Sequence, residues 1–185
     1  MNIGIIRAME NHFDLATAGP DAFEFAATEI EGKLGLPVGF VRDLLKEDDW
    51  SFVVKCHALL ESAAIFALSR IFDADAIRPT LAKVDMSRRT DMLQDLDVLP
   101  PENLAAMRAL STLRNDVAHN IGRASFTFGD HLKESKAVSR FINPFRFVWK
   151  EEVQDSLTRS QPKWTVWLAV VQALSYMTWR PNSHT

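Results

Sequence analysis

The hydrophobic positions of this chain recur mostly at spacings of three and four residues, which is the period of an amphipathic α-helix. The longest such pattern covers residues 50–72, where one apolar stripe also contains His57. On a helix of 3.6 residues per turn, the members of this stripe fall within a sector about 80° wide. The pattern therefore predicts that the longest helix of the protein spans residues 50–72.

Capping and helix-stopping residues, read together with the same periodicity, predict further helices. Asp21 and Glu24 form a capping-box-like start for a helix that we expect to end at residue 31. Other helices are expected over residues 40–46, 86–96, 102–119 and 162–179. This series predicts an all-α helical bundle formed by one domain over residues 1–185. Its core is expected to lie in residues 48–121 together with the C-terminal helix, 162–179.

Residues 123–150 depart from the helical pattern. Residues 124–128 alternate between small or polar and aromatic side chains, and a Gly-Asp turn signal follows them. The aromatic residues of 141–149 show a similar alternation around Pro144. We expect either a small β-hairpin or an aromatic-anchored loop in this region.

Composition excludes several classes of protein. The 185 residues are 47% hydrophobic, which is too apolar for a disordered chain. A single cysteine excludes a disulfide framework and a zinc site built from several thiolates, and it indicates a reducing compartment. The apolar stretch at residues 164–179 is shorter than the roughly 20 residues of a membrane span. We therefore expect a soluble, cytoplasmic protein without a membrane partner.

Charge divides unevenly along the chain. The formal net charge is −3, which gives no overall nucleic-acid signature. Residues 1–100 hold 10 Lys and Arg against 17 Asp and Glu, whereas residues 101–185 hold 11 against 7. The basic C-terminal part could supply a local patch for phosphate, and a mosaic surface with chance asymmetry is the alternative. The basic residues of 101–150 are Arg108, Arg114, Arg123, Lys133, Lys136, Arg140, Arg146 and Lys150.

Residues 114–120, Arg-Asn-Asp-Val-Ala-His-Asn, include the end of the helix expected over 102–119. On a helical wheel Arg114 falls inside the apolar sector of that helix. A guanidinium there is costly unless it is paired or faces a water-filled cleft. One interpretation is an arginine that extends its charged end to water or pairs with a carboxylate on a neighbouring helix, for which Glu61 is the candidate. The other is a guanidinium that binds phosphate, which its planar fork suits.

His119 follows Arg114 at the C-terminal end of the same helix. A histidine that titrates near neutrality beside an arginine is a workable acid–base and charge-stabilising pair for phosphodiester cleavage. Asn115 lies one turn before His119 on the same side of the helix. The structural alternative is a histidine that caps the last carbonyls of the helix. The Arg-x4-His spacing alone is a weak signal.

In an all-helical chain, Arg-Asn-x-x-Ala-His-Asn at the end of an amphipathic helix resembles the signature of the HEPN superfamily. Residues 49–63, Asp-Trp-Ser-Phe-Val-Val-Lys-Cys-His-Ala-Leu-Leu-Glu-Ser-Ala, are similar to the long helix that precedes this motif in the superfamily. They are also similar to the corresponding helix of mannitol-operon-repressor-like proteins. The resemblance covers residues 48–121, and residues 1–40 and 123–160 have no counterpart in it.

The resemblance implies a metal-independent endoribonuclease that acts as a homodimer, with the two motifs meeting at the dimer seam. It implies that Arg114 binds the scissile phosphate, that His119 transfers protons during attack by the 2′-hydroxyl, and that Asn115 orients the site. No cofactor or metal is expected. Many members of the superfamily are toxins or defence effectors, which makes an inhibitor or antitoxin protein an expected partner. The alternative is a non-catalytic dimeric helical regulator, similar to the mannitol-operon-repressor-like group.

Two other candidates have structural explanations. His57 and Glu61 are four residues apart and could share a metal, but no third ligand is evident, so we expect a hydrogen-bonded core histidine. Cys56 lacks an obvious activating neighbour beyond Lys55 and His57. We therefore expect a buried structural thiol.

Overall fold

The computed structural model describes residues 20–119, 125–133 and 138–179, and within these ranges every regular element is a helix. The predicted all-α fold is therefore confirmed. The longer helices are α2 (Pro20–Leu34), α4 (Asp49–Ile71), α6 (Met86–Asp95), α7 (Pro101–His119), α10 (Gln154–Ser160) and α11 (Pro162–Trp179). The shorter elements are α3 (Phe40–Asp43), η1 (Leu44–Lys46), η2 (Asp75–Ile77), α5 (Arg78–Leu81), α8 (Phe128–His131), η4 (Val138–Ile142), α9 (Asn143–Phe145) and η5 (Arg146–Val148).

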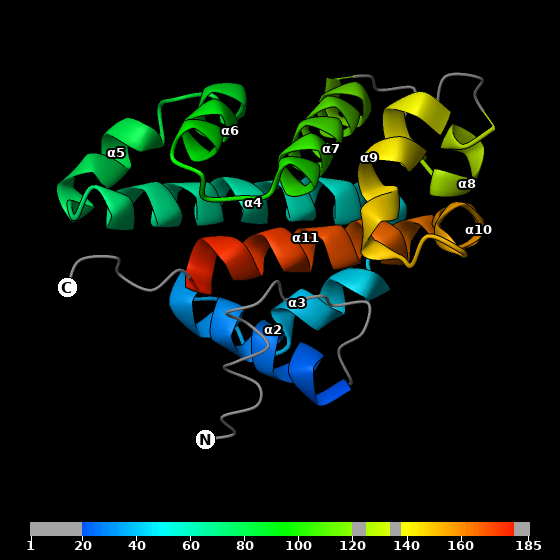
Figure 1. The fold of residues 1–185 in the computed structure, drawn as a ribbon, viewed down its shortest axis with the longest axis horizontal. Coiled ribbons are helices and arrows are strands. Elements are labelled where there is room, and N and C mark those ends of the chain that lie inside the picture. The colour runs from blue at the N-terminus through cyan, green and yellow to red at the C-terminus, as the bar shows by residue number, and fades with distance from the viewer. Residues whose placement is uncertain (1–19, 120–124, 134–137, 180–185) are drawn as a thin grey trace.

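Helix α4 is the central element, with α11 packed along it (Figure 1). In Figure 1, α6 and α7 cover one side of this pair, and α2 with α3 covers the other. Asp48 caps α4, because its Oδ1 accepts a hydrogen bond of 2.9 Å from the Ser51 amide. Surrounded in this way, α4 buries residues on more than one face, from Phe52 to Ser69.

Burial also explains the hydrophobicity of α4. By length and composition it is the one described helix that could cross a membrane, and 56% of its most apolar 18-residue window is buried inside the protein. Much of that apolar surface packs against α7 and α11. This behaviour is typical of the core helix of a soluble protein.

Helix α7 runs antiparallel to α4, as two side-chain contacts show. The indole Nε1 of Trp50 donates to the Val117 carbonyl over 3.1 Å, and His57 Nε2 lies 3.2 Å from Ser111 Oγ. The start of α4 therefore faces the end of α7. This register decides which polar side chains meet between the two helices.

A buried carboxylate holds the other side of the bundle together. Glu31, near the end of α2, is 3% exposed, and its oxygens accept hydrogen bonds from the amides of Gly39 at 2.9 Å and Val41 at 2.8 Å. Gly39 has φ 85°, a left-handed conformation that suits glycine. Trp167 of α11 donates to the Val41 carbonyl over 2.8 Å, so α2, α3 and α11 are tied at one point.

The hairpin expected over residues 123–150 is wrong for the residues that the structure describes there. Residues 128–131 form α8, and residues 138–148 form three successive short helical elements, with no strand between them. The Thr127 hydroxyl starts α8 by accepting a hydrogen bond from the Asp130 amide. The aromatic side chains pack on one another instead of lining one face of a sheet, with ring centroids 5.0–5.5 Å apart along the series Phe126, Phe128, Phe141 and Phe145. An aromatic-anchored segment, the alternative expectation, fits this packing.

Candidate functional site

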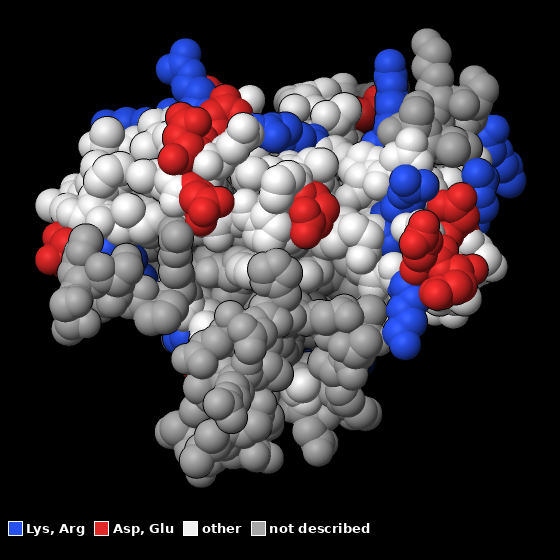
Figure 2. Space-filling view, in the orientation of Figure 1, with Lys and Arg blue, Asp and Glu red and all other residues white. Residues whose placement is uncertain are grey.

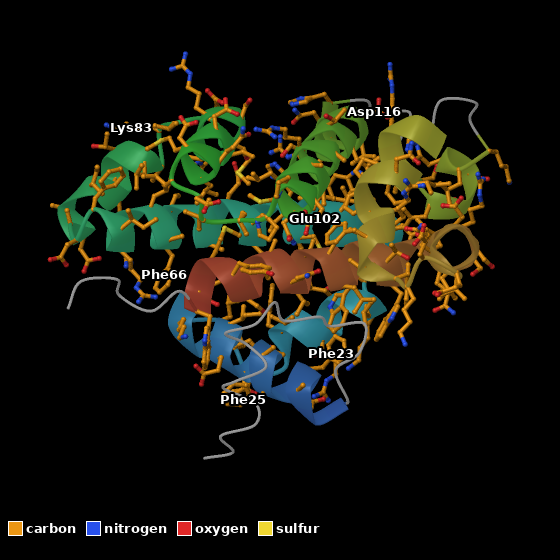
Figure 3. All side chains as sticks on the ribbon, in the orientation of Figure 1. Phe23, Phe25, Phe66, Lys83, Glu102 and Asp116 are labelled. Carbon is orange, nitrogen blue, oxygen red and sulfur yellow. The ribbon has the colours of Figure 1, made fainter. Side chains whose placement is uncertain are left out.

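The last two turns of α7 carry the three predicted site residues. Arg114 is half-buried, whereas Asn115 and His119 are exposed. In Figure 3, Asp116 marks this end of α7 at the edge of the molecule, far from Glu102 at the opposite end of the helix beside α11. The motif therefore lies at the surface of the bundle.

The first turn of α4 fixes the end of α7 in place. The hydrogen bond from Trp50 to the Val117 carbonyl satisfies one of the last carbonyls of α7, which have no partner within the helix. Next to it, Asp49 accepts a hydrogen bond of 3.0 Å from the Phe128 amide at the start of α8. The backbone within the motif and the backbone after it are thus held by two neighbouring residues of α4.

Arg114 has a neutral partner. Its Nη1 donates a hydrogen bond of 3.0 Å to the Asn115 side-chain oxygen. Among the residues whose positions are described, no carboxylate lies within ion-pair distance of this guanidinium. An amide orients an arginine without neutralising it, so Arg114 keeps its charge and its remaining donors for an anion.

The predicted ion pair between Arg114 and Glu61 is wrong. The Glu61 carboxylate lies 3.0 Å from Nη2 of Arg89 on α6, and the Glu61 carbonyl accepts a second hydrogen bond of 3.2 Å from Arg89 Nη1. The antiparallel register explains the difference. Ser111 faces His57, so Arg114 lies toward the start of α4, whereas Glu61 lies one turn beyond His57 in the opposite direction.

His57 lies between Glu61 and Ser111 in a polar cluster that also contains Arg89, and it is only 5% exposed. Its Nε2 lies against Ser111, and its Nδ1 lies 3.6 Å from the Glu61 carboxylate. Burial lowers the pKa of His57, the Glu61 charge opposes this shift, and the charges of Arg114 and Arg89 add to it. The pKa of His57 therefore lies below its ordinary value of 6.5, and the ring is neutral at pH 7. The expectation of a hydrogen-bonded core histidine is confirmed.

The described part of the chain offers neither a metal site nor a reactive thiol. No group of three or more His, Cys, Asp and Glu side chains there could hold a metal ion. Cys56 is fully buried, and burial raises the pKa of its thiol far above the ordinary value. A thiol in that state is a poor nucleophile, so Cys56 has the structural role expected for it.

Sequence reasoning missed Arg89, which is 4% exposed and lies 3.0 Å from the Glu61 carboxylate. The sequence does contain a signal for Arg89. This residue lies between Met86 and Leu93 at helical spacing, inside the apolar face of α6. A charged residue in an apolar stripe is the same feature that marks Arg114. Ser111 carried no comparable signal, because a serine at its position is compatible with either side of a helix.

The basic residues of 101–150 are partly neutralised where the structure describes them. Arg108 lies 2.9 Å from Asp91, Lys133 lies 2.8 Å from Asp130, and Arg146 lies 3.8 Å from Asp155. Figure 2 shows blue and red side chains interspersed over α8–α10, with no continuous basic surface on that face. Arg123 and Lys136 fall outside the described residues. The charge pattern visible here is a mosaic.

Comparison with known proteins adds no relative. No family model, no curated protein and no solved structure matches the chain. The similarity to the HEPN superfamily therefore depends on the motif residues and on the segment that precedes them.

Proposed function

We propose that this protein is a metal-independent endoribonuclease of the HEPN type, with Arg114, Asn115 and His119 at its active site. The observation that carries the proposal is the state of Arg114. A half-buried guanidinium that is bonded to an amide and has no carboxylate among the described residues is a site for an anion. A phosphodiester is an anion of the right geometry for a planar fork of donors.

The chemistry follows from the two charged side chains. The RNA 2′-hydroxyl attacks the adjacent phosphorus atom, and the bond to the 5′-oxygen breaks. His119, exposed at the end of α7, accepts the hydroxyl proton or supplies a proton to the leaving oxygen. Arg114 stabilises the charge that develops on the non-bridging oxygens, and Asn115 holds the guanidinium in position. In a homodimer that joins the two α7 ends, one His119 acts as base and the other as acid.

This function has consequences for the setting of the protein. RNA cleavage requires access to cellular RNA, and we therefore propose that the protein acts in the cytoplasm. An endoribonuclease that acts on cellular RNA also needs a protein that restrains it. We therefore propose a toxin or defence effector whose partner is an inhibitor or antitoxin protein.

The alternative is a non-catalytic dimeric helical regulator, similar to the mannitol-operon-repressor-like proteins. The mosaic surface favours it, because ion pairs such as Arg108 with Asp91 neutralise cations that RNA backbone contacts would use. A regulator needs neither an exposed His119 nor an arginine without a counter-ion. The two functions therefore differ in what the loss of His119 should do.

The test is cleavage of a mixed RNA in EDTA by the wild type and by His119→Ala, with folding checked by circular dichroism. We expect wild-type cleavage and a loss of about 10²-fold or more in the variant. Thr112→Ala, an exposed change two turns earlier on α7, is the matched control and should retain activity. Absence of cleavage by the folded wild type would support the regulator, and cleavage that survives His119→Ala would place the active site elsewhere.

A further inference from the structure

Two arginines from different helices approach the same polar cluster. Arg89 on α6 bonds to Glu61, and Arg114 on α7 lies one turn beyond Ser111, which contacts the buried ring of His57 on α4. The charges of both arginines lower the pKa of His57. One carboxylate in the described cluster, that of Glu61, lies within ion-pair distance of its basic groups. The position of the Glu61 carboxylate therefore decides the net charge around each arginine.

Arg89 holds the carboxylate with two contacts. Its two terminal nitrogens bond the side chain and the backbone carbonyl of Glu61, at 3.0 and 3.2 Å. Since the Arg89 side chain is 5% exposed, water cannot replace this partner. A buried guanidinium without a counter-ion is costly, so the fold keeps Glu61 turned toward α6.

Arg114 is on the other side of His57 from Glu61. The imidazole separates the two, with Nδ1 on the Glu61 side and Nε2 against Ser111, one turn before Arg114 on α7. If Arg89 were absent, His57 and Arg114 would be the remaining basic groups of the cluster. A glutamate side chain that is 34% exposed has the freedom to turn toward them.

We infer that Arg89 is a positioning residue, which keeps Arg114 available to an RNA phosphate by holding the Glu61 carboxylate on the opposite side of His57. The inference rests on the proposed function, and it assigns to Arg89 no contact with the substrate. The antiparallel register places Arg114 and Glu61 on opposite sides of His57, and Arg89 keeps the Glu61 side chain from turning back across the ring.

The test measures binding of a fluorescein-labelled, mixed-sequence 2′-O-methyl RNA 12-mer by anisotropy. This probe cannot be cleaved by 2′-hydroxyl attack because its 2′-oxygens are blocked. We expect Arg89→Met to raise the Kd about fivefold to tenfold, since Glu61 then neutralises Arg114. The double variant Arg89→Met/Glu61→Gln should return to within about twofold of the wild type, because it removes the released charge. Arg89→Lys should lie between the wild type and Arg89→Met.

Arg88→Met is the matched control. Arg88 precedes Arg89 on α6, its side chain is 80% exposed, and it lies beside Asp85. Its loss removes the same charge from the protein and should change the Kd by no more than about twofold. Two results would overturn the inference: an unchanged Kd in Arg89→Met, or a double variant that binds as weakly as Arg89→Met. The second result would mean that Arg89 itself contributes to binding.

A crystal structure of Arg89→Met separates this inference from the proposed function. If the wild type binds and cleaves no RNA, the proposed function fails, and the exchange of partners can still be observed directly. A Glu61 carboxylate within 4 Å of the Arg114 guanidinium supports the inference. A Glu61 that keeps its wild-type position contradicts it.

Discussion

Arg89 and Arg114 both lie on the apolar faces of their helices, yet the fold treats them in opposite ways. Arg89 is 4% exposed and has a carboxylate at 3.0 Å, whereas Arg114 is half-buried and bonded to an amide. A neutralised arginine contributes to the packing of α6 on α4. An arginine that keeps its charge at the surface can bind an anion, which is the role that we propose for Arg114. The difference shows that the partner, and not the position in an apolar stripe, distinguishes a structural arginine from a candidate functional one.

The largest expected effect is on Arg114 itself. Arg114→Met should reduce RNA cleavage by about 10² to 10³-fold, because it removes the donors that stabilise the developing phosphate charge. Single-turnover cleavage in EDTA measures this effect. Arg108→Met, which removes an exposed arginine from the same helix, is the control and should change the rate by less than about threefold. Equal losses in the two variants would show that Arg114 has no special role.

The corresponding change at the other arginine should affect stability. Glu61→Gln leaves the Arg89 guanidinium buried without a counter-ion, and it should lower the free energy of unfolding by about 2 to 3 kcal/mol. The cost is below that of a fully buried pair because the Glu61 side chain is 34% exposed. Urea denaturation measures it. Asp91→Asn breaks the exposed pair with Arg108 and should cost no more than about 1 kcal/mol.

His57 should report the same cluster through the pH dependence of stability. Its pKa is lowered in the fold, so the unfolded chain binds a proton more readily. The native state therefore loses stability as the pH falls from about 6.5, the ordinary histidine value, through the lowered pKa of His57. Ser111 and Glu61 contact the ring, and the charges of Arg89 and Arg114 also act on its pKa.

Urea denaturation between pH 7.5 and pH 5 compares the wild type with His57→Gln, a variant that cannot gain this proton. We expect the wild type to lose more stability than the variant over that range. Identical losses in the two proteins would contradict a neutral, buried His57. Gln at position 57 can still bond to Ser111, so the comparison keeps the contact between α4 and α7.

The smallest effect in this series is expected at Asn115. Asn115→Ala removes the acceptor of the Arg114 hydrogen bond and should slow cleavage about threefold to tenfold, in line with one such bond. Asn115→Asp sharpens the comparison, because a carboxylate at this position would give Arg114 the kind of partner that Arg89 has. Cleavage by Asn115→Asp should be slower than by Asn115→Ala. Faster cleavage by the aspartate variant would contradict the need for a guanidinium without a counter-ion.

The helices were largely predictable from local sequence. The stripe at residues 50–72 predicted α4, which spans Asp49–Ile71, and the helices expected over 102–119 and 162–179 correspond to α7 and α11. The hairpin prediction failed because alternating aromatic residues indicate a strand only when a second strand pairs with it, and the structure describes helical elements here instead. Phe141 and Phe145 are four residues apart, which is also a helical spacing, and their rings belong to a cluster.

The candidate site was predictable only in part. The position of Arg114 in an apolar sector was visible in the sequence, and its half-buried state agrees with that position. Its partner was not visible, because helical periodicity fixes which face a residue occupies and not the register between two helices. The contact of His57 with Ser111 sets that register and brings Glu61 to Arg89.

The most direct test of the central claim is the chemistry of the RNA ends produced by the purified protein in EDTA. Attack by the 2′-hydroxyl, with Arg114 and His119 and without a metal, predicts products that end in a 2′,3′-cyclic phosphate. It also predicts no cleavage when a single 2′-deoxynucleotide replaces the ribonucleotide at the cut site. Products with a free 3′-hydroxyl that appear only when a divalent metal is added would contradict the account.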